Sequence, residues 1–579
     1  MYLCPMNNAQ LSRIFDDIAD RSEIRGENPF AVRAYRAAAE TISGCERPLK
    51  DIYAEGGLDA LMALNGIGKE IAKKIESLVS TGKLEFYDKL RADVPDGVAA
   101  MLNVQGLGPK RVKQIWETLG VDSLEKLEAA ASEGKIAQLP KMGAKSEKAI
   151  LDGIAALKKR ATGRFLAGDV APIADDILAM LKTIPGAEQL AYAGSLRRGK
   201  ETIGDLDLLV ATRDPAPVIR AFVSMPGVEA VLGNGETKGS VRLDNGLQVD
   251  LRAIQPEVWG TALQYFTGSQ QHNIRLREMA QKQGWSLNEY ALSRGEEKRA
   301  FADEAALYEF LGLPFIPPEL REDRGEFENP IPKNLIALSD MRGDLQMHTT
   351  WSDGALDVMG MARAALALGY EYILITDHTH SLGVVKGLTP DDVLLQGEEI
   401  ARANAILKKE NAGLTVLHGV ECEVLASGAL DLPDEILARC DLVQASVHTS
   451  LGQARAQITA RAIAAIENPH VDILGHPQGR LINERDGADY DWDALFRAAA
   501  QNKVALEINA NPHRLDLNEN NARRAVELGC LLSISTDAHT PEMLRNMRFG
   551  VSIARRAWVT REKVINTWPL KKLLEFFGR

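Results

Sequence analysis

The sequence EYILITDH, residues 371–378, is a short apolar run that ends in an aspartate and a histidine. Three further apolar runs also end in a histidine: CDLVQASVH (440–448), VDILGH (471–476) and LLSISTDAH (531–539), the last with an aspartate as well. Apolar runs of this length, separated by helical stretches, are typical of buried parallel strands. The C-terminal ends of such strands converge at one mouth of a barrel, so the polar residues after them are expected to meet there. Imidazoles and carboxylates brought together in this way predict a metal-dependent enzyme in residues 341–579.

The length and composition of the chain set broad limits on its class. At 579 residues it is long enough for three or four domains. A content of 45% hydrophobic and 26% charged residues is typical of a soluble globular protein. We find no long apolar run and no signal-peptide pattern, so a cytoplasmic location without membrane contact is expected. The five cysteines form no CxxC pair and are expected to be reduced and structural.

The net charge of −12 is unevenly distributed. Residues 1–160 carry 24 Lys and Arg against 23 Asp and Glu, residues 161–340 carry 19 against 26, and residues 341–579 carry 25 against 31. A bulk positive field that would attract nucleic acid is therefore excluded. Any DNA contact by the first 160 residues must depend on local basic clusters and backbone amides.

Two segments near the N-terminus share a glycine-paired turn. They are LNGIGKEIAKKI (64–75) and VQGLGPKRVKQI (104–115), and LPKMGAKSEKAI (139–150) is a partial third copy. Two glycines around one apolar residue allow a tight turn between helices, whose outward amides can hold a phosphate beside the basic residues that follow. The pattern resembles the helix-hairpin-helix motif and predicts contact with the DNA backbone through Gly66, Gly68, Gly106, Gly108 and Lys110. The alternative is an interhelical turn with a solvated basic face.

The segment AGSLRRGKETIGDLDLLV, residues 193–210, contains a pair of aspartates. Asp205 and Asp207 are two apart on an expected strand, so their carboxylates point to the same face. Asp250, in the alternating strand LQVDLRAI (247–254), completes a cluster if the two strands are neighbours. Three carboxylates repel one another unless divalent cations neutralise them, and Mg²⁺ prefers oxygen ligands together with substrate phosphates. With Ser195 and Arg198 nearby, the pattern predicts nucleotidyl transfer rather than an exposed acidic strand edge.

Several further segments match a known family. They are AYRAAAETI (34–42), GIGKEIAKKIESLVSTGKL (66–84), GLGPKRV (106–112), YFTGSQQHNIRLR (265–277) and LNEY (287–290). Together with the aspartate segments they resemble family X DNA polymerases of the DNA polymerase β type. The resemblance implies that Asp205, Asp207 and Asp250 are catalytic carboxylates that bind Mg²⁺ or Mn²⁺, and that Arg277 approaches the template strand. It implies that the incoming dNTP contacts Arg164, Ser195, Arg198, Gly204, Tyr265, Phe266, Gly268 and Asn273.

The N-terminal 90 or so residues resemble the domain that, in this family, binds a 5′-phosphate and cleaves an abasic sugar. Lys74 matches the lysine that forms the Schiff base, and Tyr35 lies in a matching AYR segment. A position where the family carries a phosphate-binding lysine is Glu70 here. Lys74 as nucleophile and Lys74 as an ordinary surface lysine therefore both stay open.

Six histidine-rich segments resemble the PHP (polymerase and histidinol phosphatase) domain. They are GDLQMHTTWSDG (343–354), ITDHTHS (375–381), HGVECEV (418–424), ASVHTS (445–450), LGHP (474–477) and STDAH (535–539). The resemblance implies up to three Mn²⁺ or Zn²⁺ ions, held by His348, Asp353, His378, Glu421, His448, His476, Asp537 and His539. The family's first motif often reads HxH, whereas this chain has Gln346 before His348. Glu507 is a weaker candidate for a supporting role.

The predicted fold class is a multidomain α/β and α+β protein. We expect helical helix-hairpin-helix domains at the N-terminus, a nucleotidyltransferase palm with a thumb or finger subdomain, and a C-terminal distorted (β/α)₇ PHP barrel. The predicted boundaries are 1–92 (5′-phosphate and DNA binding, lyase-like), 93–160 (second helix-hairpin-helix), 161–257 (palm), 258–317 (nucleotide selection), 318–340 (linker) and 341–579 (PHP barrel).

The resemblances together imply a DNA-directed DNA polymerase that fills gaps in DNA repair. The barrel is implied to be a 3′–5′ exonuclease, with abasic-site cleavage as a further activity of the group. The expected partners are gapped or primer-template DNA with a 5′-phosphate, and dNTPs, and the protein is expected to be a monomer. Two alternatives remain: a polymerase fused to a small-molecule phosphatase, and a DNA-end-binding scaffold whose active sites have decayed.

Overall fold

The computed structural model describes residues 8–45, 49–64, 66–104, 107–140, 142–159, 164–382, 386–483, 485 and 487–579. Contacts divide the chain into two compact units, Met1–Gly163 and Arg164–Arg579. Each unit is considered by itself. Within the described ranges, no helix combines the length and the apolarity needed to cross a bilayer.

The described part of the first unit is helical, as its apolar spacing predicts. One core joins the helices up to α5, and a second core joins α6 to α9 together with Ile24 of α1. Gly66 and Gly68 lie in the short turn before α4, and Gly108 directly precedes α7. Both helices end at a glycine in the left-handed conformation, Gly82 and Gly120. The helices are α1 (Asn8–Arg25), α2 (Pro29–Gly44), α3 (Leu49–Met62), α4 (Lys69–Thr81), α5 (Glu85–Asp93), α6 (Asp96–Ala100), α7 (Pro109–Leu119), α8 (Leu124–Ser132) and α9 (Ala144–Lys159).

The second unit begins with a five-stranded mixed sheet, the palm, in the order β2-β4-β7-β6-β5. Helices α10 (Ala167–Lys182) and α12 (Pro215–Val223) contribute to the same buried cluster as its strands, and α11 (Gly194–Arg197) follows β2. The strands are β2 (Gln189–Tyr192), β4 (Asp205–Ala211), β5 (Val228–Asn234), β6 (Lys238–Leu243) and β7 (Gln248–Ile254). The short strands β1 (Phe165–Leu166) and β3 (Thr202–Ile203) pair separately.

Residues 259–310 form a small α/β subdomain with its own core. It contains α13 (Trp259–Thr267), α14 (Gln270–Lys282), the three-stranded sheet of β8 (Ser286–Leu287), β9 (Leu292–Arg294) and β10 (Glu297–Arg299), and α15 (Glu304–Phe310).

The charged, proline-rich segment expected as a linker is packed against this subdomain. Arg321 is fully buried, its Nη1 lies 2.6 Å from a carboxylate oxygen of Glu304, and its Nε donates to the carbonyl of Ile316. Glu326 is also buried, and its carboxylate lies 2.8 Å from Nδ1 of His272. The segment leads on to the C-terminal strands, and ion pairs with the preceding subdomain hold it in place.

The C-terminal part is a parallel seven-stranded sheet with the strands in sequence order, β11 to β17. A bridge between Met347 and Ala538 joins the chain after β11 to the chain after β17, so the sheet nearly closes into a barrel. The strands are β11 (Gly343–Asp344), β12 (Tyr372–Ile375), β13 (Thr415–Glu423), β14 (Leu442–Ser446), β15 (Ile473–Gly475), β16 (Ala505–Asn509) and β17 (Leu532–Ser535).

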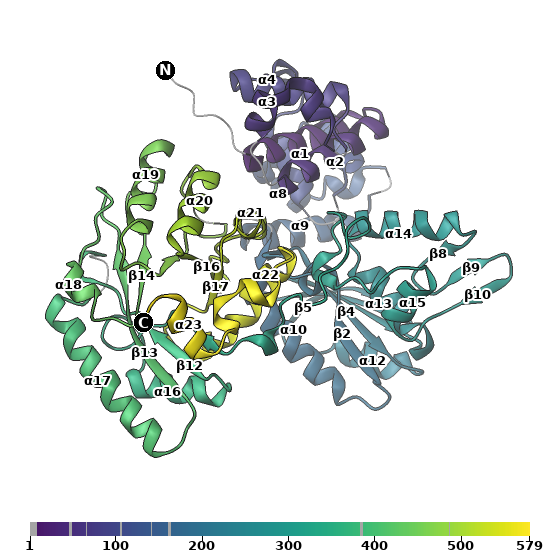
Figure 1. Cartoon of the computed structure of the whole chain (residues 1–579). Helices are drawn as coiled ribbons and strands as arrows, with labels where there is room; N and C mark the ends of the chain where they lie inside the picture. The colour runs from purple at the N-terminus through teal and green to yellow at the C-terminus, as the bar shows by residue number, and fades with distance from the viewer. Residues whose placement is uncertain are drawn as a thin grey trace. The chain divides into compact units, whose positions relative to one another are not determined.

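Helices surround these strands (Figure 1). They are α16 (Val358–Ala367), α17 (Pro390–Lys409), α18 (Asp434–Leu437), α19 (Arg455–Ile466), α20 (Trp492–Asn502), α21 (Glu519–Glu527), α22 (Met547–Arg556) and α23 (Leu570–Phe576). The predicted fold class, with helical N-terminal domains, a palm with a thumb-like subdomain and a (β/α)₇ barrel, is confirmed.

Candidate active sites

The aspartate trio lies on two neighbouring palm strands. Parallel pairing of β4 with β7 sets Asp207 directly opposite Asp250, and Asp205 lies two residues before Asp207 on the same face. One carboxylate oxygen from each of the three lies within 4.8 Å of the others. Burial, together with the charges of Asp205 and Asp250, raises the pKa of Asp207 to about 7. Repulsion of this kind is what bound divalent cations relieve, so the donor set fits such ions.

Two backbone features hold the trio in place. Gly194 has a φ of +57°, and a Cβ built on it would lie 2.3 Å from Oδ2 of Asp207, so only glycine lets the chain approach this carboxylate so closely. Asp250 is oriented by hydrogen bonds from Ser240 and from Nε2 of Gln248, which is 3.2 Å away. The carboxylates are therefore positioned before any ion arrives.

A pocket of about 340 Å³ opens beside the trio. Ten residues predicted from the sequence line it: Asp205, Asp207, Arg164, Ser195, Arg198, Gly204, Tyr265, Phe266, Gly268 and Asn273. The structure thus brings together the whole set expected to contact the nucleotide, from the palm and from α13 and α14. Arg277 lies one helical turn beyond Asn273, to whose carbonyl its Nε donates at 3.2 Å, and it does not line the pocket.

The arginines and the turn after α13 are held by their neighbours. Arg164 donates to the hydroxyl and the carbonyl of Thr202, and Gly204 leaves room for its guanidinium. Gly268 has a φ of +31°, and a Cβ there would lie 2.4 Å from Nδ2 of Asn273. Asn273 in turn donates to the carbonyl of Tyr265 at 2.7 Å. These contacts shape the pocket wall that faces the trio.

The glycine-paired turns begin α4 and α7. Gly66 has a φ of +79°, and Gly68 and Gly108 precede the two helices with no atom near the position of a Cβ, so the helix amides are open to approach. Lys110 lies in the first turn of α7. The predicted residue Gly106 lies outside the described residues.

Lys74 lies on α4 between two aromatic rings. Its Nζ is 5.6 Å from the ring centre of Tyr35 and 4.9 Å from that of Phe86. The neighbouring Lys73 instead pairs with Glu70 at 3.2 Å. The contacts of Lys74 are therefore aromatic, whereas Lys73 pairs with a carboxylate.

The predicted barrel ligands lie at the C-terminal ends of the strands and in the loops that follow them. Glu421 lies at the centre, and its carboxylate is 3.1 Å from Nδ1 of His378, 3.2 Å from Nε2 of His448 and 2.7 Å from Nε2 of His476. His348 lies 3.1 Å from Asp537, and its other nitrogen is 3.7 Å from Asp353. Asp353 also lies 3.4 Å from His539. All eight predicted ligands therefore belong to one cluster.

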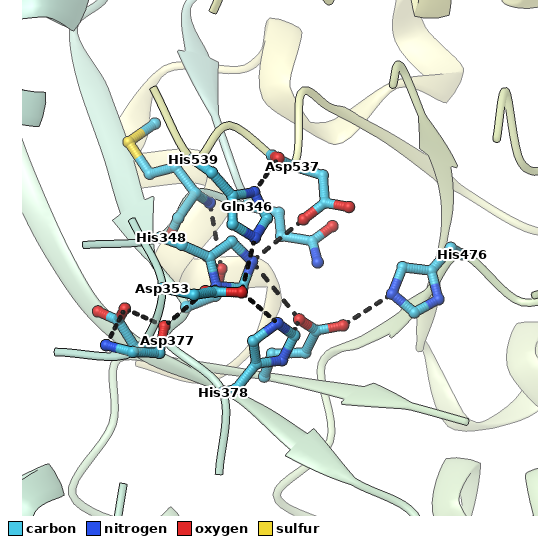
Figure 2. A network of polar contacts seen from close by, with 12 residues as sticks. Gln346, His348, Asp353, Asp377, His378, His476, Asp537 and His539 are labelled. Carbon is cyan, nitrogen blue, oxygen red and sulfur yellow. Dashed lines mark hydrogen bonds and ion pairs between the residues drawn. The ribbon is translucent and has the colours of Figure 1, made fainter. Parts of the chain in front are cut away.

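Figure 2 shows His348 amid this cluster, with Asp353, His378, Asp537 and His539 around it and His476 to one side. Three overlapping groups could each hold an ion: His348, Asp353, His378 and His539; His378, Glu421 and His448; and His348, Glu421 and Asp537. His476 belongs to none of these groups and contacts the cluster through Glu421. His476 and Asp537 adopt left-handed φ values of +24° and +54°, a strained conformation that is common at functional sites.

The electrostatics of the cluster are those of an ion-binding site. Burial alone would raise the pKa of Glu421, but His378 and His448 outweigh it and hold the pKa well below its ordinary value. For His448, burial is likewise outweighed by Glu421 and Glu423, which raise its pKa to about 9. Among the described residues, Nδ1 of His348 and Nδ1 of His476 are buried without a hydrogen-bonded partner. Buried nitrogens of this kind are suited to metal coordination.

Gln346 lies within the same cluster, where the family pattern has an imidazole. It is fully buried beside His348 and Asp537 (Figure 2), and its carbonyl oxygen accepts from Nδ2 of Asn509 at 3.4 Å. Its amide nitrogen is buried without a hydrogen-bonded partner among the described residues. Glu507, expected as a supporting residue, accepts from the backbone amide of His476 at 2.6 Å, and burial raises its pKa well above the ordinary value.

Two further carboxylates of the site, Glu423 and Asp377, were not among the predicted site residues. Glu423 accepts from Nδ1 of His448 at 2.6 Å, which sets the ring orientation. Asp377 accepts from the amide and hydroxyl of Thr349 and of Ser352, and from Gln396, and so fixes the loop before Asp353. Glu423 could have been found, because it lies two residues after Glu421 on the same strand.

Comparison with known protein families gives matches in both helical regions of the first unit and in the subdomain after the palm. Residues 6–84 match a helix-hairpin-helix domain, residues 98–156 a SAM-like helix-hairpin-helix tandem, and residues 262–322 the DNA polymerase beta thumb. The chain is 38% identical to the DNA polymerase/3′-5′ exonuclease PolX of Bacillus subtilis over 99% of its own length and 100% of that protein.

Two other relatives each match part of the chain. DNA polymerase lambda of Rattus norvegicus is 23% identical over 54% of the chain and 56% of its own length. A probable phosphatase of Thermoanaerobacter sp. (strain X514) is 28% identical over 39% of the chain and 89% of its own length.

Proposed function

The chain belongs to the family of the DNA polymerase/3′-5′ exonuclease PolX, and from this premise we propose that its two activities occupy two separate sites. It is a DNA-directed DNA polymerase with a 3′–5′ exonuclease and DNA-binding helix-hairpin-helix domains. The observation that carries the assignment is that the aspartate trio and the histidine cluster form two distinct groups of candidate metal ligands.

The palm pocket is the proposed polymerase site. Divalent ions held by Asp205, Asp207 and Asp250 would supply charge neutralisation and acidify the primer 3′-hydroxyl. Arg198 and Arg164 present guanidinium groups to the triphosphate, and the Ser195 hydroxyl donates to a phosphate oxygen. Tyr265, Phe266 and Gly268 line the sugar position, and Asn273 faces the base. Arg277 lies beyond the pocket, toward the template.

The histidine cluster is the proposed exonuclease site. Ions held there would acidify a water molecule and neutralise the scissile phosphate. The chain's own contribution is orientation: Glu421 joins three imidazoles, Glu423 holds the His448 ring, and Asp377 holds the loop that carries Asp353. Oxygen and imidazole donors together suit Mn²⁺ or Zn²⁺. Mg²⁺ or Mn²⁺ suits the all-carboxylate palm site.

A pair of variants tests the assignment of the two sites. A 5′-labelled primer on a gapped duplex is incubated with Mn²⁺, with and without dNTPs, using wild type, Asp207→Ala and His448→Ala. Asp207→Ala is expected to lose extension and to keep stepwise loss of 3′ nucleotides, whereas His448→Ala is expected to show the reverse. Loss of both activities in either variant would contradict two separate sites.

The phosphatase relatives favour a second possibility for the barrel, hydrolysis of small phosphomonoesters. The same three proteins are therefore assayed with p-nitrophenyl phosphate. We expect turnover of this compound to be much slower than removal of 3′ nucleotides. The opposite ranking, with activity lost in His448→Ala, would assign the barrel as a phosphatase.

Finer features of the substrate and the partners are also proposals. We infer that the preferred DNA is a short gap with a 5′-phosphate, bound by the amides at Gly66, Gly68 and Gly108, by Gly106 and by Lys110. Extension of gapped duplexes with and without a 5′-phosphate tests this preference. A monomeric state and a cytoplasmic location stay predictions, as do the proposed domain boundaries.

Lys74 is the proposed nucleophile for abasic-sugar cleavage, because its Nζ lies against Tyr35 and Phe86 and reaches only the backbone carbonyl of Glu70, whereas Lys73 pairs with the Glu70 carboxylate. Borohydride trapping on DNA with a 5′ abasic sugar tests this role. Trapping is expected to disappear in Lys74→Ala and to persist in the matched variant Lys73→Ala. An equal yield from Lys74→Ala would return Lys74 to the class of surface lysines.

A further inference from the structure

Arg556, the last residue of barrel helix α22, contacts the polymerase site directly. The residue is almost fully buried, with 4% of its surface exposed. Nη1 donates to the backbone carbonyl of Arg198 at 2.6 Å and lies 3.0 Å from a carboxylate oxygen of Glu322. The other face of the guanidinium pairs with Glu519 at the start of α21. One barrel side chain thus joins three segments that are far apart in the sequence.

Glu322 connects Arg556 to the nucleotide pocket. Its carboxylate accepts from Nε of Arg198 at 3.0 Å and lies 3.7 Å from Nζ of Lys200, and both of these residues line the pocket. Burial alone would raise the pKa of Glu322, but Arg556, Lys200 and Arg198 outweigh it and lower the pKa to about 2. Glu322 is therefore ionised and shared between the barrel arginine and two cations of the polymerase site.

The turn after Arg198 is pressed against the same helix. Gly199 has a φ of +66°, and a Cβ built on it would lie 1.9 Å from Oγ of Ser552, on α22. No other residue type fits between the turn and the helix without movement. This contact is independent of the ion pairs and leads to the same conclusion, that α22 supports the Arg198–Lys200 turn.

We propose that Arg556 is a positioning residue of the polymerase, so that the barrel helps to build the dNTP site. Arg556 holds the Arg198 carbonyl and, through Glu322, the direction of the Arg198 guanidinium. This inference rests on the proposed role of Arg198 in binding the triphosphate. The polymerase site is then incomplete without the barrel, whether or not the exonuclease is active.

The loss of Arg556 has a defined consequence. Glu322 and Glu519 would keep their charges with one cation fewer, and Glu322 would draw Arg198 and Lys200 away from the triphosphate. Buried hydrogen bonds to charged groups are strong enough for a change of about tenfold in binding. We therefore expect the KM for dNTP to rise about tenfold in Arg556→Gln, with a much smaller change in kcat.

The experiment uses the full chain and single-nucleotide insertion on a gapped duplex. KM and kcat are measured for wild type, Arg556→Gln, Arg556→Gln with Glu519→Gln, Arg198→Gln and Arg524→Gln. Arg524 is the matched control, because it pairs with Asp493 inside the barrel and is absent from the nucleotide pocket. Exonuclease rate and Tm are recorded for each protein to show that the barrel remains folded.

The double variant distinguishes the effect of the lost contact with Arg198 from the effect of the changed net charge. It restores the net charge but not the contact with the Arg198 carbonyl, so its KM should stay raised. A KM that returns to the wild-type value in the double variant, or one that is unchanged in Arg556→Gln, would overturn the proposal. So would a parallel fall of insertion, exonuclease rate and Tm in Arg556→Gln, because it would indicate a structural role only. If Arg198→Gln leaves KM unchanged, the proposed nucleotide role of Arg198 fails instead.

Discussion

Replacement of Asp207 by asparagine should stabilise the protein in the absence of metal while it removes polymerisation. A folded-state pKa of about 7 against an ordinary value of 3.8 corresponds to about 4 kcal/mol of unfavourable free energy for the ionised form. Because the folded-state pKa is raised, the wild type is not penalised below pH 4, loses stability as the pH rises, and has lost the full amount above pH 7. The amide of Asp207→Asn carries no charge at any pH, so the variant lacks this loss.

Thermal unfolding in EDTA measures the effect. The difference in Tm between Asp207→Asn and wild type should grow by about 4 °C from pH 4 to pH 8 if the unit Arg164–Arg579 unfolds as a whole. Any constant cost of burying the amide cancels in this comparison. Addition of Mg²⁺ at pH 8 should close the difference, because the ions neutralise the trio of the wild type.

Asp176→Asn is the matched control, because Asp176 is an exposed carboxylate on palm helix α10. Its Tm difference from wild type should not change with pH. A difference for Asp207→Asn that is equally flat between pH 4 and pH 8 would refute the reasoning, as would stabilisation of both proteins by Mg²⁺ to the same extent.

Four other outcomes follow from the site contacts. Gly194→Ala should lower insertion more than 100-fold in a gap-filling assay while the exonuclease is retained, because its Cβ would displace the Asp207 carboxylate. Glu423→Gln should lower the exonuclease rate about 10- to 100-fold without affecting insertion, because His448 loses the carboxylate that orients it. Gln346→His should retain more metal after dialysis, measured by elemental analysis, because an imidazole replaces a weakly ligating amide. The apparent affinity of the exonuclease for Mn²⁺ should increase from pH 6 to pH 9, because the metal-free His448 has a pKa of about 9 and must lose its proton to coordinate.

Much of the two sites could be predicted because the relevant signals are local. The two-residue spacing of Asp205 and Asp207 placed both on one strand face, and the apolar runs before His378 and His476 marked strand ends. The same reasoning applied to Glu421 would have found Glu423. Sequence spacing predicts which side chains share a strand face because successive residues of a strand alternate between its two faces.

The contacts that join distant segments could not be predicted in this way. Arg556 meets Glu322 across 234 residues, and nothing in a charge pattern selects one carboxylate among 80 acidic residues. Residues 318–340 were expected as a linker, whereas Arg321 and Glu326 within them are buried by partners that lie elsewhere. Burial of a charge is decided by the tertiary partner, which the sequence does not display.

The bridge between Met347 and Ala538 has a consequence for the order in which a newly made chain becomes active. It joins the chain after the first barrel strand to the chain after the last, so His348 cannot meet Asp537 and His539 until the residues of β17 and the turn after it have been synthesised. The palm carboxylates are synthesised some 300 residues earlier. A partly translated chain can therefore assemble its aspartate trio, but it has no means of hydrolysing DNA in the barrel until the final strand has docked.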